Sequence, residues 1–397
     1  MIQRSITPKL VSLAKQFPAI VLTGPRQSGK TTLAKMAFPK YAYVSLENLD
    51  NRDFATRDPR GFLAEYQKRV IIDEAQRAPD LLSYIQTVVD EDASPGRYIL
   101  TGSQQFNLLA GISQSLAGRA AYLRLLPFSV SELAGSKPVD AFALSTPDHR
   151  PPPKGLALET VLFQGLYPRI YDRKLAARDF LAAYIAAYIE RDVREVTRVG
   201  DLSTFRRFLQ LCAGRSGQIL NLSNLGADCG ISHPTARQWL SVLEASSIVV
   251  LLQPFHKNFN KRIVKSPKLY FLDSGLMCHL LRLRDADDLR GHPLYGSIFE
   301  TFVMSEVHKA FAHLGESPPL YYWRDRTGHE IDLIVESGRS LTAVEIKSAK
   351  TVSSDFFKQL RYFAGLKGVS GDSVLVYGGE ESTKREGVRI RTWHQAS

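Results

Sequence analysis

The chain has few cysteines and no long apolar run, and each shortage excludes a class of protein. Only three cysteines occur in 397 residues, and no two stand at CxxC or zinc-finger spacing. The sequence therefore predicts neither a disulfide framework nor a cysteine-based metal site. No apolar run approaches the roughly 18 residues of a membrane-spanning helix, and the first residues, MIQRSITPKLVSLAKQF, lack the apolar core of a signal peptide. We expect a cytoplasmic protein with no membrane partner.

The composition is that of a folded, mildly basic protein. Hydrophobic residues make up 44% and charged residues 23%, close to globular averages, which excludes wholesale disorder. A length of 397 residues predicts two or three domains at about 150 residues each. The 51 Lys and Arg exceed the 40 Asp and Glu by 11. That excess suits an anionic partner such as nucleic acid and suits a merely basic soluble protein equally well.

Composition and periodicity divide the chain into five expected parts. Residues 1–135 alternate short apolar runs (AIVLTG, YAYVSL, RVIIDE, RYILTG) with helix-like stretches, which predicts a parallel α/β sheet. Residues 136–158 are rich in Pro, Ser and Gly and lack a sustained period, which is typical of a linker. Residues 159–199 are mostly helical, 200–275 combine helices with a strand, and 276–397 form a last α/β domain.

The run AIVLTGPRQSGKTTLAK carries a phosphate-binding loop of the form Gly-x4-Gly-Lys-Thr between a strand-like and a helix-like run. The glycines let backbone N–H groups surround phosphates at a helix N-terminus. Lys30 would reach the β- and γ-phosphates of ATP, and the Thr31 hydroxyl would bind Mg²⁺. The predicted nucleotide-binding residues are Gly24, Pro25, Arg26, Gln27, Ser28, Gly29, Lys30, Thr31 and Thr32.

A second apolar strand delivers an acidic pair about forty residues later. Asp73 would hold Mg²⁺, directly or through water, and Glu74 would polarise the attacking water. A third strand ends near Ser103 and Gln104, either of which could sense the γ-phosphate or simply cap the next helix. Arg119 is the candidate for an arginine that stabilises transition-state charge, supplied across a subunit interface; a plain surface arginine is the alternative.

Residues 205–255 predict a helix-turn-helix followed by a strand. Apolar spacing buries one face of the helix pair, and Pro234 suits the first turn of the second helix. The residues left near its exposed N-terminal half, where a recognition helix meets a major groove, are Ser232, His233, Thr235, Arg237 and Gln238. An acid-free basic run follows and would contact DNA phosphates as a wing, through Lys257, Lys261, Arg262, Lys265 and Lys268. The alternative is a winged helix that serves as a protein–protein module.

The last domain predicts a hairpin that brings acidic residues and a lysine together. Alternation places Glu345 and Lys347 on one face of the second strand, and Asp332 lies opposite position 344 or 345. A preceding helix could add Glu300. Asp332 and Glu345 could hold a second Mg²⁺ and, with Lys347 and Glu300, support phosphodiester hydrolysis. The alternative is a domain that only grips DNA.

Two resemblances follow from these motifs. The chain resembles a prokaryotic family of AAA-type ATPases with a C-terminal domain of unknown function. The resemblance rests on the runs GPRQSGKTTL, VIIDEAQ, ILTGSQQF and SLAGRAAYLRLLPFSVSEL, and it extends through GLYPRI, YIERDV, KSPKLYFLDSGL and FETFVMSEV. The order Glu300, Asp332, Glu345-x-Lys347 resembles the restriction-endonuclease-like PD-(D/E)xK core, with Ile331 at the usual proline.

The resemblance implies an AAA-type P-loop core at 1–135, a helical lid at 159–199, a winged helix-turn-helix at 200–275 and a restriction-endonuclease-like α/β domain at 276–397. It also implies a homo-oligomer, including a hexamer as one form. The expected activity is ATP hydrolysis stimulated by DNA, in a motor that remodels DNA as a helicase, a translocase or a processor of branched DNA. The alternatives are a nucleotide-controlled regulatory switch without translocation and an ATP-gated, Mg²⁺-dependent DNA nuclease.

Overall fold

A computed structural model of the chain describes residues 2–103, 116–148, 150–189, 202–255, 266–367 and 369–396. The predicted residues Gln104, Lys257, Lys261, Arg262 and Lys265 lie outside these ranges. The chain forms two compact units. The first comprises Met1–Phe128 with the short segments Ala245–Ser247 and Ala312–Glu316, and the second comprises the rest.

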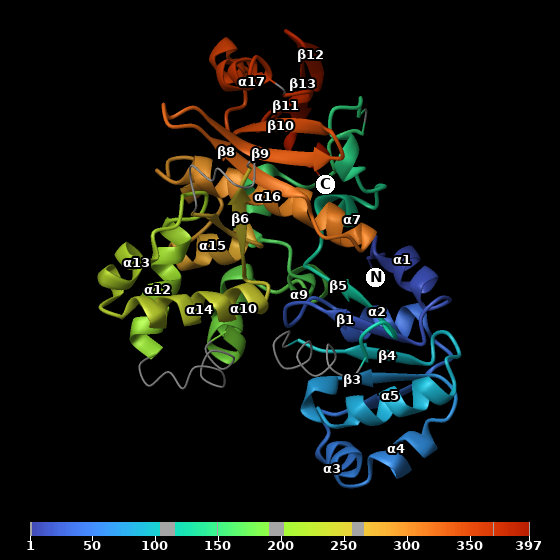
Figure 1. The fold of residues 1–397 in the computed structure, drawn as a ribbon. Coiled ribbons are helices and arrows are strands. Elements are labelled where there is room, and N and C mark those ends of the chain that lie inside the picture. The colour runs from blue at the N-terminus through green and yellow to red at the C-terminus, as the bar shows by residue number, and fades with distance from the viewer. Residues whose placement is uncertain are drawn as a thin grey trace. The chain divides into compact units, whose positions relative to one another are not determined.

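The first unit is built on a five-stranded parallel sheet in the order β2-β3-β4-β1-β5. Figure 1 labels four of its strands, β3, β4, β1 and β5. The strands are β1 (Ala19–Thr23), β2 (Ala42–Ser45), β3 (Val70–Asp73), β4 (Tyr98–Thr101) and β5 (Ala120–Arg124). The first four are the apolar runs that the sequence indicated, so the prediction of a parallel α/β sheet is confirmed. Strands β1, β3 and β4 are buried along their whole length, because helices cover both faces of the sheet.

The two faces of this sheet have separate apolar cores. On one face, α1 (Thr7–Leu13) and α2 (Lys30–Ala37) pack on Ile20, Leu22 and Ile99. On the other, α3 (Leu49–Arg57), α4 (Pro59–Glu65), the 3-10 turn η1 (Ala75–Arg77) and α5 (Leu81–Glu91) pack on Val21 and Ile72. Alternate residues of each strand thus serve opposite cores, as the pleat of a strand requires.

The second unit begins with helices. These are α7 (Val130–Ala134), η2 (Ala141–Ala143), α8 (Leu158–Gln164), α9 (Pro168–Asp172), α10 (Ala177–Tyr184), η3 (Ile185–Ile189), α12 (Leu202–Gly214), α13 (Leu222–Cys229) and α14 (His233–Ala245). Gly230, at φ 71°, ends α13 in the left-handed conformation that favours glycine. The helix, Gly-Ile-Ser turn and helix expected from the sequence are therefore present.

An eight-stranded mixed sheet forms the rest of the second unit, in the order β12-β13-β11-β10-β9-β8-β6-β7. Its strands are β6 (Val249–Pro254), β7 (Lys268–Phe271), β8 (Leu320–Arg324), β9 (Glu330–Ser337), β10 (Ser340–Lys347), β11 (Gly371–Tyr377), β12 (Thr383–Arg385) and β13 (Val388–Thr392). The helical segments among them are α15 (Ser274–Leu280), η4 (Asp287–Leu289), α16 (Tyr295–Leu314), η5 (Ser354–Phe357), α17 (Lys358–Ala364) and η6 (Trp393–Gln395). Because β6 pairs with β8, the predicted winged helix and the predicted last domain share one sheet.

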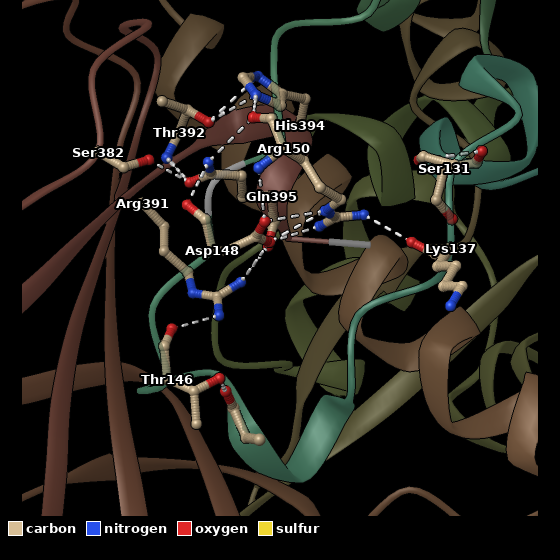
Figure 2. Close-up of polar contacts among 12 residues, drawn as sticks. Ser131, Lys137, Thr146, Asp148, Arg150, Ser382, Arg391, Thr392, His394 and Gln395 are labelled. Atoms are coloured by element: carbon tan, nitrogen blue, oxygen red, sulfur yellow. Dashed lines mark hydrogen bonds and ion pairs between the residues drawn. The ribbon is translucent and has the colours of Figure 1, made fainter.

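Residues 136–158, expected to be a linker, form hydrogen bonds and an ion pair with residues near the C-terminus (Figure 2). Arg391, only 2% exposed, donates to the carbonyls of Thr146 at 2.9 Å and Gln395 at 2.7 Å and pairs with Asp148 at 3.3 Å. Arg150 holds the same carboxylate at 2.8 Å. Thr146, Asp148 and Arg150 thus contact β13 and η6, and the five-part division of the chain stays a prediction.

Candidate functional site

The loop after β1 has a backbone shape that two of its glycines make possible. Gly24 has φ 140°, and a Cβ there would lie 2.0 Å from the carbonyl oxygen of Leu125. Gly29, at φ 92°, is the N-cap of α2. Gln27 also has a positive φ of 63°, which is strained for a side chain with a Cβ. The loop therefore has a closely fitted fold that turns directly into a helix N-terminus, the geometry that receives phosphates.

Lys30 lies beneath this loop. Its side chain is buried, and the ammonium group donates to the carbonyls of Gly24 at 3.0 Å and Pro25 at 2.9 Å. The charge is thus held at the loop that the sequence assigned to phosphates. Of the other predicted loop residues, Arg26 and Ser28 are also buried, whereas Thr32 is exposed on α2.

Arg4, near the N-terminus, holds the phosphate loop in place through hydrogen bonds that the sequence did not predict. Its guanidinium donates to the carbonyls of Ser28 at 2.8 Å and Leu126 at 2.6 Å, and lies 4.8 Å from the ring centre of Phe128. The partners are 24 and 122 residues away along the chain. No local pattern marks such an arginine, so no sequence signal could have found it.

Asp73 lies at the end of β3 and accepts hydrogen bonds from three hydroxyl groups. Thr31 donates at 2.9 Å, Tyr43 donates at 3.0 Å, and Thr101 donates to the same oxygen as Thr31. Burial and the Asp73 charge raise the pKa of Tyr43 to about 12. The predicted pair of Thr31 and Asp73 is brought together, and this set of hydroxyl and carboxylate oxygens fits Mg²⁺. No sequence pattern assigned a role to Tyr43 or to Thr101, although Thr101 lies within the run ILTGSQQF.

Glu74 follows directly and has a left-handed backbone, with φ 57°. Its carboxylate accepts from the Ser103 hydroxyl at 3.2 Å and from the side-chain amide of Gln76. Among the described residues, Oε1 of Gln76 is buried without a donor. The structure thus brings together Glu74 and Ser103, the two groups predicted to serve the γ-phosphate side of the site.

Arg119 stands just before β5 and pairs with an acid of the same unit. Its guanidinium binds the carboxylate of Asp90 through two nitrogens, one of them at 3.0 Å. Its side chain is 35% exposed. The predicted contribution of Arg119 to a neighbouring subunit stays a prediction.

A second polar site lies in the other unit, where β7, α16, β9 and β10 meet. We call it the carboxylate cluster, made of Glu300, Glu330, Asp332, Glu345, Lys268 and Lys347. The register of β9 and β10 pairs Val344 with Leu333, so its continuation puts Asp332 opposite position 345, one of the two positions predicted. Oδ2 of Asp332 accepts the Ile346 N–H at 2.9 Å, and Lys347 contacts Glu345 at 2.5 Å.

Lys268 belongs to this cluster and not to an exposed wing. Its side chain is 3% exposed, and its ammonium lies 2.5 Å from Glu330 and 3.4 Å from Glu300. The prediction that Lys268 contacts DNA phosphates is therefore wrong, because its side chain is buried and two partly buried carboxylates pair with its charge. The helix α14, by contrast, leaves Arg237 and Gln238 exposed, with Thr235 partly buried.

The electrostatics of the carboxylate cluster favour neutral acids. Burial and the nearby charge of Asp332 raise the pKa of both Glu300 and Glu345 above the ordinary range. Oε2 of Glu345 is buried and, among the described residues, has no donor. Within the described part of the chain, no three His, Cys, Asp or Glu side chains are grouped so that they could hold a metal ion together. A metal ion here would use Asp332 and Glu345 with backbone or solvent oxygens.

No helix among the described residues is both long and apolar enough to cross a membrane.

Comparisons with known protein families match three stretches of the chain. Residues 16–134 match the family described as AAA domain. Residues 156–287 and 295–394 match two families described as domains of unknown function, DUF8612 and DUF4143.

Similar proteins extend the likeness over most of the chain. The uncharacterized proteins Rv2008c of Mycobacterium tuberculosis and Mb2031c of Mycobacterium bovis are each 33% identical over 353 residues, which is 88% of this chain and 75% of each relative. Among solved structures, the Walker-type ATPase paby2304 of Pyrococcus abyssi has a TM-score of 0.46 at 16% identity, over 70% of this chain and 96% of that one. RuvB of Thermotoga maritima has a TM-score of 0.32 at 20% identity, over 63% and 90%. The chain belongs to the family of the two mycobacterial proteins, as a P-loop ATPase of the AAA type with a C-terminal domain of unknown function.

Proposed function

We propose that the chain hydrolyses ATP at the loop after β1 and uses the nucleotide cycle to act on DNA, as a DNA-stimulated motor. The observation that carries the hydrolytic part is the convergence of Thr31, Asp73, Glu74 and Ser103 at the carboxyl ends of three parallel strands. Ligands of open α/β sheets bind at this edge. Bound Mg²⁺ would neutralise charge on the phosphates.

In this proposal each residue has one task. The backbone N–H groups of the loop and Lys30 hold the phosphates, and Thr31 with Asp73 holds the metal ion. Glu74 orients and deprotonates the attacking water, while Ser103 and Gln76 fix the direction of its carboxylate. Arg119 would leave Asp90 to complete the site of a neighbouring subunit in a homo-oligomer, of which a hexamer is one form. Light scattering of the full chain with and without ATP tests that assembly.

DNA contact is proposed for the winged-helix part. Exposed Arg237 and Gln238 on the N-terminal half of α14, with partly buried Thr235 beside them, support contacts to base edges and phosphates. The basic residues Lys257, Lys261, Arg262 and Lys265 are proposed to contact the backbone.

Fluorescence anisotropy with labelled duplex tests the DNA contact. Arg237→Ala should weaken binding by about 1–3 kcal/mol. Arg57→Ala is the matched control, since Arg57 is an arginine of the first unit whose side chain is 80% exposed, and it should leave binding unchanged. Equal affinities of the two variants would remove α14 from the interface.

A second candidate function is Mg²⁺-dependent DNA cleavage at the carboxylate cluster. The observation that favours it is the buried Oε2 of Glu345, which has no donor in the described part of the chain and lies beside Asp332 and Lys347. There Asp332 and Glu345 would hold Mg²⁺, which would activate the attacking water, and Lys347 would stabilise charge on the scissile phosphate. Cutting should disappear in Asp332→Ala and Lys347→Ala and persist in Lys30→Ala. Cutting that survives Asp332→Ala would assign it to a contaminant.

A further inference from the structure

The carboxylate cluster contains two ammonium groups with different freedom to move. Lys347 has a side chain that is 34% exposed, whereas the side chain of Lys268 is only 3% exposed. An exposed lysine can swing away from its partners at little cost, but a buried one has no room to do so. The ammonium group at the Lys268 end of the cluster is therefore fixed, whereas the one at the Lys347 end can move.

Lys268 fills the end formed by Glu300 and Glu330. Its ammonium lies within ion-pair distance of both carboxylates, at 3.4 Å and 2.5 Å, and stands 5.6 Å from the ring centre of Tyr322. The hydroxyl of Tyr270 donates at 2.5 Å to the Glu300 oxygen that Lys268 also contacts. This oxygen of Glu300 is therefore already satisfied by two donors of the chain itself.

The other end of the cluster has a carboxylate oxygen that is not yet satisfied. Oε1 of Glu345 contacts Lys347 at 2.5 Å, but Oε2 is buried with no donor among the described residues. Oδ2 of Asp332 accepts one backbone N–H and lies 4.0 Å from Lys347. A buried carboxylate oxygen without a partner is costly unless a proton or a cation meets it.

We propose that Lys268 takes the place of a second metal ion at Glu300 and Glu330, so that the cluster binds a single divalent cation, at Asp332 and Glu345. This rests on the metal site of the second candidate function above. A cation at Glu300 would stand beside the fixed ammonium of Lys268, and the two like charges would repel. Glu300 is then a positioning residue that acts through Lys268 and Tyr270.

The test counts metal ions in the full chain without nucleotide. Mn²⁺ is the probe, and the loss of the free Mn²⁺ signal in electron paramagnetic resonance gives the number bound. All variants also carry Asp73→Asn, which removes the metal-binding carboxylate of the first unit. With Lys268 intact we expect one Mn²⁺ per chain, lost in Asp332→Asn. Lys268→Arg should keep one, and Lys268→Met should admit a second.

The number of bound ions distinguishes failure of the single-cation inference from failure of the metal site itself. Two Mn²⁺ ions with Lys268 intact would overturn the single-cation inference and leave the metal site standing, whereas none would overturn the metal site and the inference together. A folded Lys268→Met chain that still binds one ion would also overturn the inference. If that variant does not fold, Glu300→Gln decides: we expect it still to bind one ion, with the affinity lowered by no more than about 10–100-fold, because Glu300 positions the cluster but is not a ligand, and complete loss of the ion would contradict the inference.

Discussion

Arg4→Met is the perturbation that most directly probes how the phosphate loop is held. The substitution keeps most of the side-chain volume and removes the guanidinium that joins Ser28 of the loop to Leu126 after β5. Arg4 is 7% exposed, so water does not readily replace these bonds. The loop carbonyl and the carbonyl after β5 both lose this donor, and the cation over the Phe128 ring is lost as well.

The magnitude follows from those contacts. A buried carbonyl left without its donor costs about 1–3 kcal/mol, and the cation–ring contact adds about 0.5–2 kcal/mol. Because the three losses share one group and are not additive, we expect the free energy of unfolding of the first unit to fall by about 3 kcal/mol. ADP should bind more weakly by about tenfold or more, since part of this energy orders the loop.

The assay must follow the first unit by itself. Pulse-labelling hydrogen exchange across a urea series, read on peptides from β1, gives its stability, and anisotropy of a fluorescent ADP gives nucleotide affinity. Arg57→Met is the control, because the Arg57–Asp53 pair is exposed and contributes at most about 0.5 kcal/mol. If Arg4→Met matched this control in both measurements, the Arg4 contacts would have no energetic role.

Three further predictions concern single side chains. Ser103→Ala removes a donor from Glu74 and should lower kcat about tenfold with little change in KM, measured by steady-state turnover. Asp273→Ala leaves two buried backbone N–H groups without their acceptors at 2.7 and 2.9 Å and should cost the second unit about 2–4 kcal/mol in urea unfolding. Burial lowers the pKa of His394, so the folded chain holds it neutral while the unfolded chain binds a proton below pH about 6.5. The contribution of His394 to the free energy of unfolding should therefore fall as pH drops from about 7 to 5.5, by at most about 1.4 kcal/mol per pH unit, and it is measured as the pH-dependent difference in unfolding free energy between the wild-type chain and His394→Gln.

Local sequence patterns predicted much of the secondary structure and of the nucleotide site of the first unit. The phosphate loop and the acid-bearing strand were predictable because each joins a periodic apolar run to residues whose spacing fixes their chemistry. The strand order β2-β3-β4-β1-β5 was not, since it depends on crossovers between distant segments. The hydroxyl of Tyr43 reaches Asp73 only through the pairing of β2 with β3.

Local charge and composition did not predict contacts with residues that lie far away in the chain. Lys268 ends a basic run and was expected at a surface, yet Glu300 and Glu330 lie 32 and 62 positions later in the chain and bury it. The segment around Asp148 lacked any period and was expected to be a linker. It is held by Arg391, 243 residues away, and composition alone says nothing of such a contact.

We propose that DNA drives the nucleotide cycle, and a measurement of ATP turnover tests this proposal most directly. Hydrolysis is measured with Mg²⁺ in the absence of DNA and then with linear duplex, single-stranded and branched DNA, with Lys30→Ala as the control for contaminating activity. We predict that one DNA form stimulates the wild-type chain strongly and that Lys30→Ala is inactive with all of them. Turnover that is absent, or equal with and without every DNA, would contradict the motor and favour a nucleotide-controlled switch.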